Sequence, residues 1–444
     1  MELKNKKITV IGMGRSGIAS ANFLAGKKAQ VTLIDQKERQ DLEEAVQQLN
    51  PSVQTKFGSS ALAGNEELLI LSPGIDINSS FLESAVQRGI PIWSEVELAC
   101  RFSTSPIIAI TGTNGKSTTT TLIGKILQAA GKSVLIGGNI GIPFISLVDQ
   151  EAPDFLVLEI SSFQMEAIEK FRPKISVVLN ITPDHLDRHK AMATYIRLKE
   201  KISENQTEND YLILNQDDPN TKNLGQNSRA QKLFFSATDE VKTGVFLREN
   251  SLMLRMNATE KKICNLDDLN QVMQWQVENV LAASLASSLL NIPLETIAET
   301  LKQFTGLEHR MEWVRTYQGI DFVNDSKGTN VGAVQKSLQS LSRPVVLIVG
   351  GKDKESNFLP LQQVFKQKVK HLILIGEAKS KFRQILNGSF NYEEADSMEE
   401  AVRKATGHAT SGDVVLLSPA CASFDMFKDY ADRGNQFKSI VHSL

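Results

Sequence analysis

The chain has 444 residues, of which 41% are hydrophobic and 23% charged, and its formal net charge is −2. This length predicts about three domains of ordinary size. The near-neutral charge gives no electrostatic reason to bind nucleic acid or an anionic membrane. No apolar run is long enough to cross a bilayer, and the start of the chain lacks a cleavable apolar core. The three cysteines, Cys100, Cys264 and Cys421, are too widely spaced for a disulfide framework or a zinc site. We expect a cytoplasmic protein without membrane insertion.

The first block of the chain, residues 7–93, begins with a nucleotide-binding pattern. The apolar run Ile8–Ile11 predicts a strand, and Gly12-x-Gly14-x-x-Gly17 follows it and opens a predicted helix. A second predicted strand, Val31–Ile34, ends at Asp35. Glycines between a strand and a helix, with an acid at the end of the next strand, meet the dinucleotide-binding fingerprint. Taken alone, this block favours an NAD-dependent dehydrogenase.

The second block, residues 94–307, contains a phosphate-binding pattern of a different kind. The apolar run Ile107–Ile110 enters a glycine-bracketed turn that leads into a predicted helix. The residues of this turn are Gly112, Thr113, Asn114, Gly115, Lys116, Ser117 and Thr118. Glycines allow backbone N–H groups to approach an anion, the lysine reaches the distal phosphates, and the serine offers a hydroxyl to Mg²⁺. The early glycine of the full P-loop pattern is absent, so a purely structural strand–turn–helix stays open.

The two patterns lead to different functions. A dehydrogenase has no use for a second, ATP-type loop, so we favour a double-nucleotide interpretation. In it, the first block binds a substrate that carries a nucleotide, and the second block binds ATP. Both interpretations place a diphosphate on residues 14–17. A nucleotide-binding module without catalytic activity is a further alternative.

Polar residues follow two other apolar strands of the second block. Glu159 ends the run Phe155–Glu159, where its carboxylate suits Mg²⁺, a hard cation that takes oxygen ligands. His185 lies in a loop rich in titratable groups, just after the run Ile175–Asn180, and such loops at strand ends are often functional. Lys199 stands on the next predicted helix among other charged residues, which is typical of a solvated cationic face.

The third block, residues 308–444, repeats the alternation of strands and helices. Val345–Gly351, Leu372–Gly376 and Val414–Leu417 are short apolar strands, each followed by a helical pattern. Ser423 is predicted to begin an amphipathic helix whose N-terminus favours an anion. Across the whole chain, this alternation predicts an α/β protein with parallel sheets covered by helices and with sites at the carboxyl ends of the strands.

Several motifs together resemble the Mur ligases, which build the cytoplasmic peptide of peptidoglycan. In the second block these are residues 112–118, Glu159-Ile160-Ser161-Ser162-Phe163-Gln164, Asp184-His185-Leu186-Asp187-Arg188 and Leu307-Glu308-His309-Arg310. In the third block, residues 324–330 and 418–427 resemble the D-glutamate-adding branch. The resemblance covers the chain from end to end.

This resemblance implies three domains: a Rossmann-like UDP-substrate-binding domain at 1–93, a P-loop-type ATP-binding domain at 94–307, and a Rossmann-like amino-acid-binding domain at 308–444. The implied activity is ATP- and Mg²⁺-dependent ligation of D-glutamate to UDP-N-acetylmuramoyl-L-alanine through an acyl phosphate. It would require closure of the third domain, and we expect a monomer.

The resemblance also implies roles for individual residues. Lys116, His185 and Lys199 are expected to be catalytic, and Lys199 to be carbamylated. Mg²⁺ is assigned to Ser117, Glu159, His185 and Lys199. Beyond residues 112–118, ATP is assigned to Asn279, Arg310, Asp325 and Lys327. The UDP substrate is assigned to Gly14, Arg15, Ser16, Asp35, Gly74, Asn139 and Gln164. D-glutamate is assigned to Thr329, Lys354, Ser423 and Tyr430.

Overall fold

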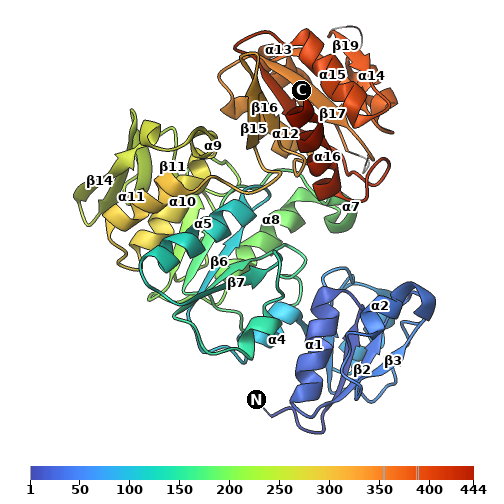
Figure 1. The fold of residues 1–444 in the computed structure, drawn as a ribbon. Coiled ribbons are helices and arrows are strands. Elements are labelled where there is room, and N and C mark those ends of the chain that lie inside the picture. The colour runs from blue at the N-terminus through green and yellow to red at the C-terminus, as the bar shows by residue number, and fades with distance from the viewer. Residues whose placement is uncertain (1, 354–355, 387, 389) are drawn as a thin grey trace. The chain divides into compact units, whose positions relative to one another are not determined.

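The computed structural model describes residues 2–353, 356–386, 388 and 390–444. It divides into two compact units, residues 1–265 with 278–301 and residues 266–277 with 302–444. Among the described residues the strands form sheets of five, nine and six strands. The first two sheets belong to the first unit and the third to the second unit, and Figure 1 colours them from blue to red along the chain. None of the described helices is long and apolar enough to cross a membrane.

The first sheet is entirely parallel, with the order β3-β2-β1-β4-β5. Its faces are both apolar: Leu68 and Ile70 of β4 pack in the core that includes α1, whereas Leu69 and Leu71 pack with residues of α3. Continuous apolar strands of this kind require helices on both faces. The elements are β1 (Lys7–Ile11), α1 (Arg15–Gly26), β2 (Gln30–Ile34), α2 (Glu43–Val46), β3 (Gln54–Lys56), β4 (Leu68–Leu71), α3 (Glu83–Gln87), β5 (Ile92–Ser94) and α4 (Glu95–Cys100).

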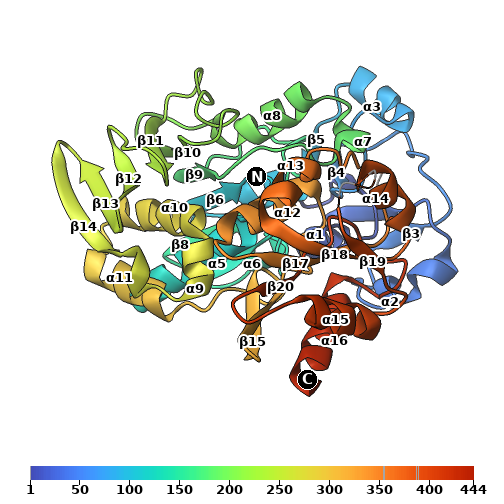
Figure 2. The same cartoon turned by 90° about the horizontal axis from the view of Figure 1, so that it is seen from above.

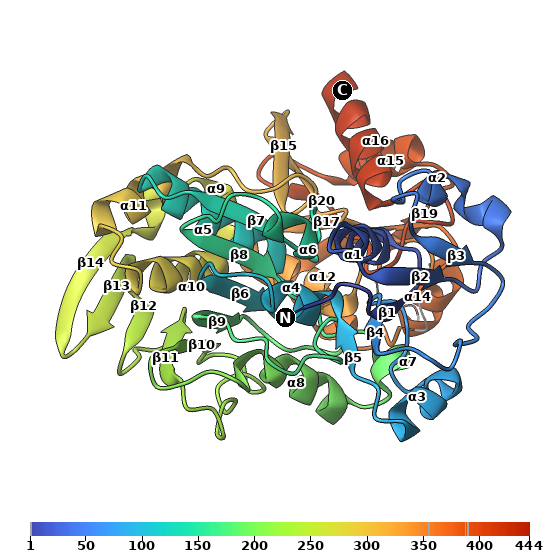
Figure 3. The same ribbon diagram turned by 90° about the horizontal axis from the view of Figure 1, so that it is seen from below.

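The central sheet has the order β14-β13-β12-β11-β10-β9-β6-β8-β7, and Figure 3 shows this row of strands from below. It is parallel from β7 to β12, and β13 and β14 are antiparallel additions at one edge. Its strands are β6 (Ile107–Thr111), β7 (Val134–Gly138), β8 (Phe155–Glu159), β9 (Ile175–Val178), β10 (Tyr211–Asn215), β11 (Gln231–Ser236), β12 (Gly244–Arg248), β13 (Ser251–Met256) and β14 (Thr259–Asn265). Its helices are α5 (Lys116–Ala129), α6 (Ile145–Val148), α7 (Leu186–His189), α8 (Met192–Glu200), α10 (Val277–Ser288) and α11 (Leu294–Gln303).

The third sheet has the order β15-β16-β20-β17-β18-β19, with β15 antiparallel to its neighbour and the other pairs parallel. Alternate residues of β17 face different cores: Leu347 packs with α12, α13 and α14, and Ile348 packs with α15 and α16 (Figure 2). The elements are α9 (Gln271–Trp275), β15 (Glu312–Tyr317), β16 (Ile320–Asn324), α12 (Val331–Ser340), β17 (Val345–Gly350), α13 (Leu361–Lys368), β18 (Val369–Ile375), α14 (Lys379–Leu386), β19 (Tyr392–Glu394), α15 (Met398–His408), β20 (Val414–Leu417) and α16 (Tyr430–Ser443).

The predicted α/β class is therefore confirmed, and the domain boundaries near residues 93 and 307 stay predictions. One predicted element is wrong. Ser423 begins a turn rather than a helix, in which its carbonyl accepts hydrogen bonds from the backbone N–H groups of Met426 and Phe427. The helix α16 starts only at Tyr430, because the Asp429 carboxylate caps it by accepting a bond from the Asp432 N–H at 2.8 Å.

Candidate active site

The glycine-rich turn joins β6 to the N-terminus of α5 in a conformation that two glycines make possible. Gly112 and Gly115 have φ angles of +144° and +84°, which side-chain-bearing residues rarely adopt. A Cβ atom on Gly115 would lie 2.2 Å from Oδ1 of Asn279, so a larger residue would require the Asn279 side chain to shift. Asn180, at the end of β9, accepts the Asn114 N–H at 2.8 Å and donates to the Asn114 carbonyl at 3.0 Å. These two hydrogen bonds tie the turn to the residues that follow β9.

The cationic and acidic groups predicted for phosphate and metal binding lie at this turn. Lys116 Nζ donates to the carbonyls of Gly112 at 3.0 Å and Thr113 at 2.7 Å. The Ser117 hydroxyl donates to Glu159 Oε2 at 2.5 Å, and Asn139 Nδ2 donates to Glu159 Oε1 at 2.7 Å. The hydroxyl and the carboxylate are adjacent hard oxygen donors, a chemistry that fits Mg²⁺.

The local sequence predicted that Lys199 would lie on a solvated cationic face. This prediction is wrong, because its side chain is buried. Only 1% of the residue is exposed. Its Nζ atom donates to the Gly112 carbonyl at 2.8 Å and lies 4.6 Å from the centre of the Tyr195 ring. Burial, and then the charge of Lys116, lower the pKa of Lys199 well below its ordinary value. The turn of α8 that carries Lys199 faces the phosphate-binding turn. The sequence did not predict this burial, because Lys199 stands among other charged residues on its helix.

The loop after β9 presents His185 and buries His189. His185 has φ of +53° and caps the one-turn helix α7, and its Nε2 atom lies 3.7 Å from Asp184 Oδ2. Such backbone conformations in non-glycine residues concentrate at functional sites. His189 is buried and shares a 2.9 Å hydrogen bond with the Ser162 hydroxyl, and its ring stacks on that of Phe163. The loop is therefore packed against the segment that follows β8.

A pocket of about 460 Å³ lies at the carboxyl ends of β1 and β4 and of β7 and β8. It is lined by the glycine-rich turn of the first block, by the segments after β2 and β4, and by the segments after β7 and β8. All seven residues expected to bind the UDP substrate line it: Gly14, Arg15, Ser16, Asp35, Gly74, Asn139 and Gln164. The structure thus brings together residues that are up to 150 positions apart in the sequence.

Asp35 organises the first glycine-rich turn. Its carboxylate accepts the Met13 N–H at 2.7 Å and the Lys37 N–H at 2.9 Å, which ties the turn to the end of β2. Gly17 is required by close packing, since a Cβ atom there would lie 1.9 Å from the Gly12 carbonyl oxygen. Asp35 therefore lines the pocket and also holds the backbone of the glycine-rich turn that forms part of its wall.

Two charged residues near this pocket were not singled out from the sequence. Arg188 donates to the Ile75 carbonyl at 2.8 Å and to Glu166 Oε2 at 2.8 Å, and so links the turn after β4 to the segment after β8. Glu95 is buried and accepts the Ile145 N–H at 2.6 Å. Burial raises the pKa of Glu95 to about 7, although hydrogen bonds from Ile145 and the Gln164 side chain oppose the rise. Acidic residues are common at helix starts, so the sequence did not indicate that Glu95 is buried.

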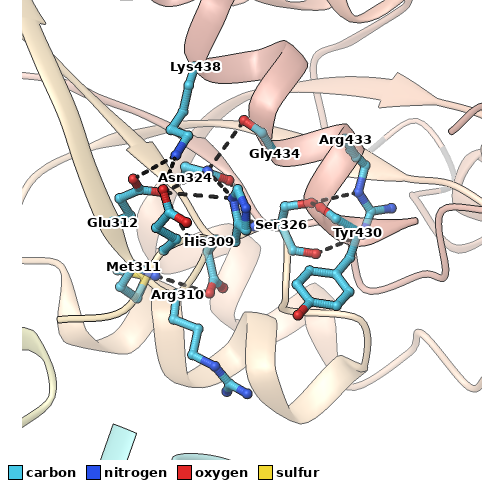
Figure 4. A network of polar contacts seen from close by, with 12 residues as sticks. His309, Arg310, Met311, Glu312, Asn324, Ser326, Tyr430, Arg433, Gly434 and Lys438 are labelled. Atoms are coloured by element: carbon cyan, nitrogen blue, oxygen red, sulfur yellow. Dashed lines mark hydrogen bonds and ion pairs between the residues drawn. The ribbon is translucent and has the colours of Figure 1, made fainter. Parts of the chain in front are cut away.

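In the second unit, Asp325 and Lys327 follow β16 as expected for a strand-end site. The Asp325 Oδ2 atom accepts hydrogen bonds from the hydroxyls of Ser337 and Ser418, both at 2.7 Å. Burial raises the pKa of Asp325 to about 6. Lys327 Nζ lies 3.6 Å from the centre of the Tyr430 ring, a cation–π contact. Figure 4 shows that the Arg310 side chain extends away from the neighbouring polar network.

Arg433, which the sequence analysis did not identify, fixes two loops of this unit to each other. Its guanidinium is completely buried, and it donates to the Ser326 hydroxyl at 2.9 Å, the Ser326 carbonyl at 2.8 Å and the Ala422 carbonyl at 3.2 Å (Figure 4). Burial lowers the pKa of Arg433 to about 10. Arg433 therefore connects the loop that contains Asp325 and Lys327 to the loop that contains Ser423.

The structure describes three of the four residues expected to bind D-glutamate. Thr329 donates its N–H to the Lys327 carbonyl at 2.8 Å, and Tyr430 packs over the Lys327 ammonium, so these two belong to one group. Ser423 lies in the loop held by Arg433 and is buried. Lys354 lies outside the described residues.

Comparison with known proteins accounts for this arrangement. Three family models match consecutive parts of the chain: the Mur ligase MurD-like N-terminal domain at residues 6–94, the Mur ligase middle domain at 110–287, and the Mur ligase, glutamate ligase domain at 309–421. The chain belongs to the Mur ligase family, and it is an ATP-dependent ligase.

Individual relatives agree with this family. A protein of Thermoanaerobacter sp. (strain X514) named UDP-N-acetylmuramoylalanine–D-glutamate ligase is 44% identical over 453 residues, with all of both chains covered. A protein of Caldanaerobacter subterraneus subsp. tengcongensis with the same name is 45% identical over 452 residues, again with both chains covered completely.

Solved structures share the fold. A pseudomurein peptide ligase type C from Methanothermus fervidus aligns with a TM-score of 0.62 at 18% identity, over 99% of this chain and 100% of that one. The MurF ligase of Thermotoga maritima, solved in complex with ADP, aligns with a TM-score of 0.59 at 15% identity, over 93% and 95% of the two chains.

Proposed function

We propose that this protein joins the amine of D-glutamate to the carboxylate of UDP-N-acetylmuramoyl-L-alanine and consumes ATP, in the synthesis of peptidoglycan. The observation that carries the proposal is the composite site of the first unit. One pocket combines the turn of a dinucleotide-type fingerprint with Asn139 and Gln164, and Asn139 also donates to Glu159 beside the phosphate-binding turn. A nucleotide-linked substrate can therefore extend from the first turn toward the phosphates of ATP.

The first chemical step activates the carboxylate. A carboxylate does not accept an amine at neutral pH, so one of its oxygens attacks the γ-phosphorus of ATP and ADP leaves, which gives an acyl phosphate. Lys116 and the N–H groups of residues 112–118 neutralise the charge on the transferring group, since phosphoryl transfer depends mainly on positioning and electrostatic stabilisation. Lys116 Nζ donates to the carbonyls of Gly112 and Thr113, which places its charge at this turn.

Mg²⁺ is part of this proposal, with Ser117, Glu159, His185 and carbamylated Lys199 as the residues that hold it. When bound, it neutralises phosphate charge and orients the reacting oxygens. Ser117 and Glu159 contribute a hydroxyl and a carboxylate side by side, and Lys199 emerges at the same turn. His185 stands in the adjacent loop with its ring edge-on to Phe163.

The second step forms the amide. The amine of D-glutamate attacks the acyl carbon and loses a proton, and phosphate leaves from the tetrahedral intermediate. We assign D-glutamate to Thr329, Lys354, Ser423 and Tyr430, and we assign ATP contacts to Asn279, Arg310, Asp325 and Lys327. Domain boundaries near residues 93 and 307, a monomeric state and a cytoplasmic location remain predictions of the sequence.

The experiment that tests this function is a phosphate-release assay with all substrates and with each one omitted. We expect release only when ATP, UDP-N-acetylmuramoyl-L-alanine and D-glutamate are present together, and none when L-glutamate replaces D-glutamate. Release that does not depend on D-glutamate would contradict the proposal. Ser423→Ala should raise the KM for D-glutamate and leave the KM for the UDP substrate unchanged, with the exposed Ser443→Ala as the matched control.

A further inference from the structure

A cluster of two histidines and a glutamate lies in the second unit, away from the loops that contain Asp325 and Ser423. His371 belongs to β18, Glu393 to the edge strand β19, and His408 ends helix α15. One potential ligand atom from each residue lies within 4.8 Å of the other two. Three elements that are separate in the sequence thus present two imidazoles and a carboxylate at one point.

The contacts within the cluster do not satisfy all of its hydrogen-bonding atoms. His408 Nε2 and Glu393 Oε1 share a 2.6 Å hydrogen bond, and the Lys404 ammonium lies 3.8 Å from the other carboxylate oxygen. The rings of His371 and His408 stack with their centres 3.6 Å apart. The Nε2 atom of His371, by contrast, is buried and has no hydrogen-bond partner among the residues that the structure describes. A buried polar nitrogen without a hydrogen-bond partner destabilises the native state.

We propose that His371, Glu393 and His408 bind one divalent transition-metal ion, with Zn²⁺ as the best match. Two imidazoles and one carboxylate form a three-ligand set that suits Zn²⁺ and leaves a fourth position for water. Mg²⁺ prefers oxygen ligands and is a poor match. The His371 imidazole is suited to ligation because burial, together with the neighbouring His408, lowers its pKa and keeps it neutral near pH 7.

Binding requires a small rearrangement that the structure permits. An ion bound at about 2.1 Å must lie near the plane of each imidazole, and parallel stacked rings do not share such a position. His408 is half-buried at the last residue of its helix, where its ring can turn, whereas His371 stands on β18 with a paired strand on each side. In the bound state the ion replaces the proton between His408 and Glu393 and also engages the unpartnered nitrogen of His371.

A bound ion would cross-link elements at the edge of the third sheet. β19 has three residues and pairs only with β18 among the described strands, so it is shorter than β15, the strand at the other edge of that sheet. A metal ion would connect β19 to β18 and to α15. Because the ion binds the folded state and not the unfolded chain, it would stabilise this unit by mass action.

The test is a titration of the full-length protein with Zn²⁺ against a chromophoric chelator, in excess Mg²⁺, with melting temperature as a second readout. We expect His371→Ala to bind one equivalent fewer than the wild type and to lose the Zn²⁺-dependent rise in melting temperature. His408→Ala and Glu393→Gln should each weaken this site at least 10-fold. The control His442→Ala, near the C-terminus, should behave as the wild type.

Either of two outcomes would overturn the proposal. In the first, the variants His371→Ala and His408→Ala bind as many equivalents of Zn²⁺ as the wild type, with equal affinity. In the second, Zn²⁺ leaves the melting temperature of the wild type unchanged. Phosphate release by each variant in Mg²⁺ alone checks its fold. If His371→Ala failed to fold, His408→Ala would decide the question, because its side chain is partly exposed.

Discussion

The Nζ atom of Lys199 donates a hydrogen bond to the carbonyl of Gly112 at a distance of 2.8 Å. This contact places a buried amine directly beneath the phosphate-binding turn, within the field of a second lysine, Lys116. An ammonium there is disfavoured, whereas a carbamate formed from the neutral amine and CO₂ would supply oxygen ligands for Mg²⁺.

Replacing Lys199 tests this role. We expect Lys199→Ala to lose nearly all phosphate release while it keeps its fold, because the anionic ligand disappears. A short-chain carboxylic acid added to this variant should restore part of the activity by occupying the vacated space. Arg197→Ala, an exposed neighbour on the same helix, is the control and should retain activity. Wild-type turnover by Lys199→Ala would rule out the carbamate.

Lys116→Ala should reduce the rate of phosphate release by about 10²–10³-fold with little change in melting temperature. Removing a preorganised electrostatic partner of the transition state typically costs this much. Lys125→Ala, on the exposed side of the same helix α5, serves as the control. Near-normal turnover by a folded Lys116→Ala protein would show that the turn does not bind the transferring phosphoryl group.

The first pocket should bind UDP-N-acetylmuramoyl-L-alanine and not NAD. Equilibrium dialysis measures both ligands under the same conditions. Asp35→Ala should weaken the sugar nucleotide at least 10-fold, because it releases the backbone of Met13 and Lys37 and so loosens the turn. Asp41→Ala, exposed beyond β2, should leave binding unchanged. Micromolar binding of NAD in competition with the sugar nucleotide would revive the dehydrogenase interpretation.

Glu95 should make the first unit less stable as the pH rises. Its pKa is raised from 4.5 in the unfolded chain to about 7 in the folded protein, so the folded state holds the proton more tightly. The resulting stabilisation is complete below pH 4.5 and is lost as the pH rises through 7, a total of about 3 kcal/mol. We expect the melting temperature of Glu95→Gln to exceed that of the wild type by more at pH 8 than at pH 5. A difference independent of pH would contradict the assignment.

The sequence predicted the strand-end residues well, and the reasons are physical. Glu159 ends β8 of the central sheet, and Asp35 follows β2 of the first sheet. The carboxyl ends of parallel strands share one edge of their sheet, so the position of each acid at such an edge follows from topology. The antiparallel strands β13 and β14 were not predicted. β14 begins with four exposed polar residues, and a run of this kind gives no strand pattern. Lys199, Glu95 and Arg433 are charged residues whose burial depends on tertiary packing. Local periodicity carries no information about that burial.

The central claim is that ATP phosphorylates the carboxylate of the UDP substrate before D-glutamate attacks. The most direct measurement uses UDP-N-acetylmuramoyl-L-alanine with both carboxylate oxygens labelled with ¹⁸O and analyses the released phosphate by mass spectrometry. An acyl phosphate carries one carboxylate oxygen away when phosphate departs, so each phosphate formed should contain one ¹⁸O atom. Unlabelled phosphate, released together with amide product, would contradict the account.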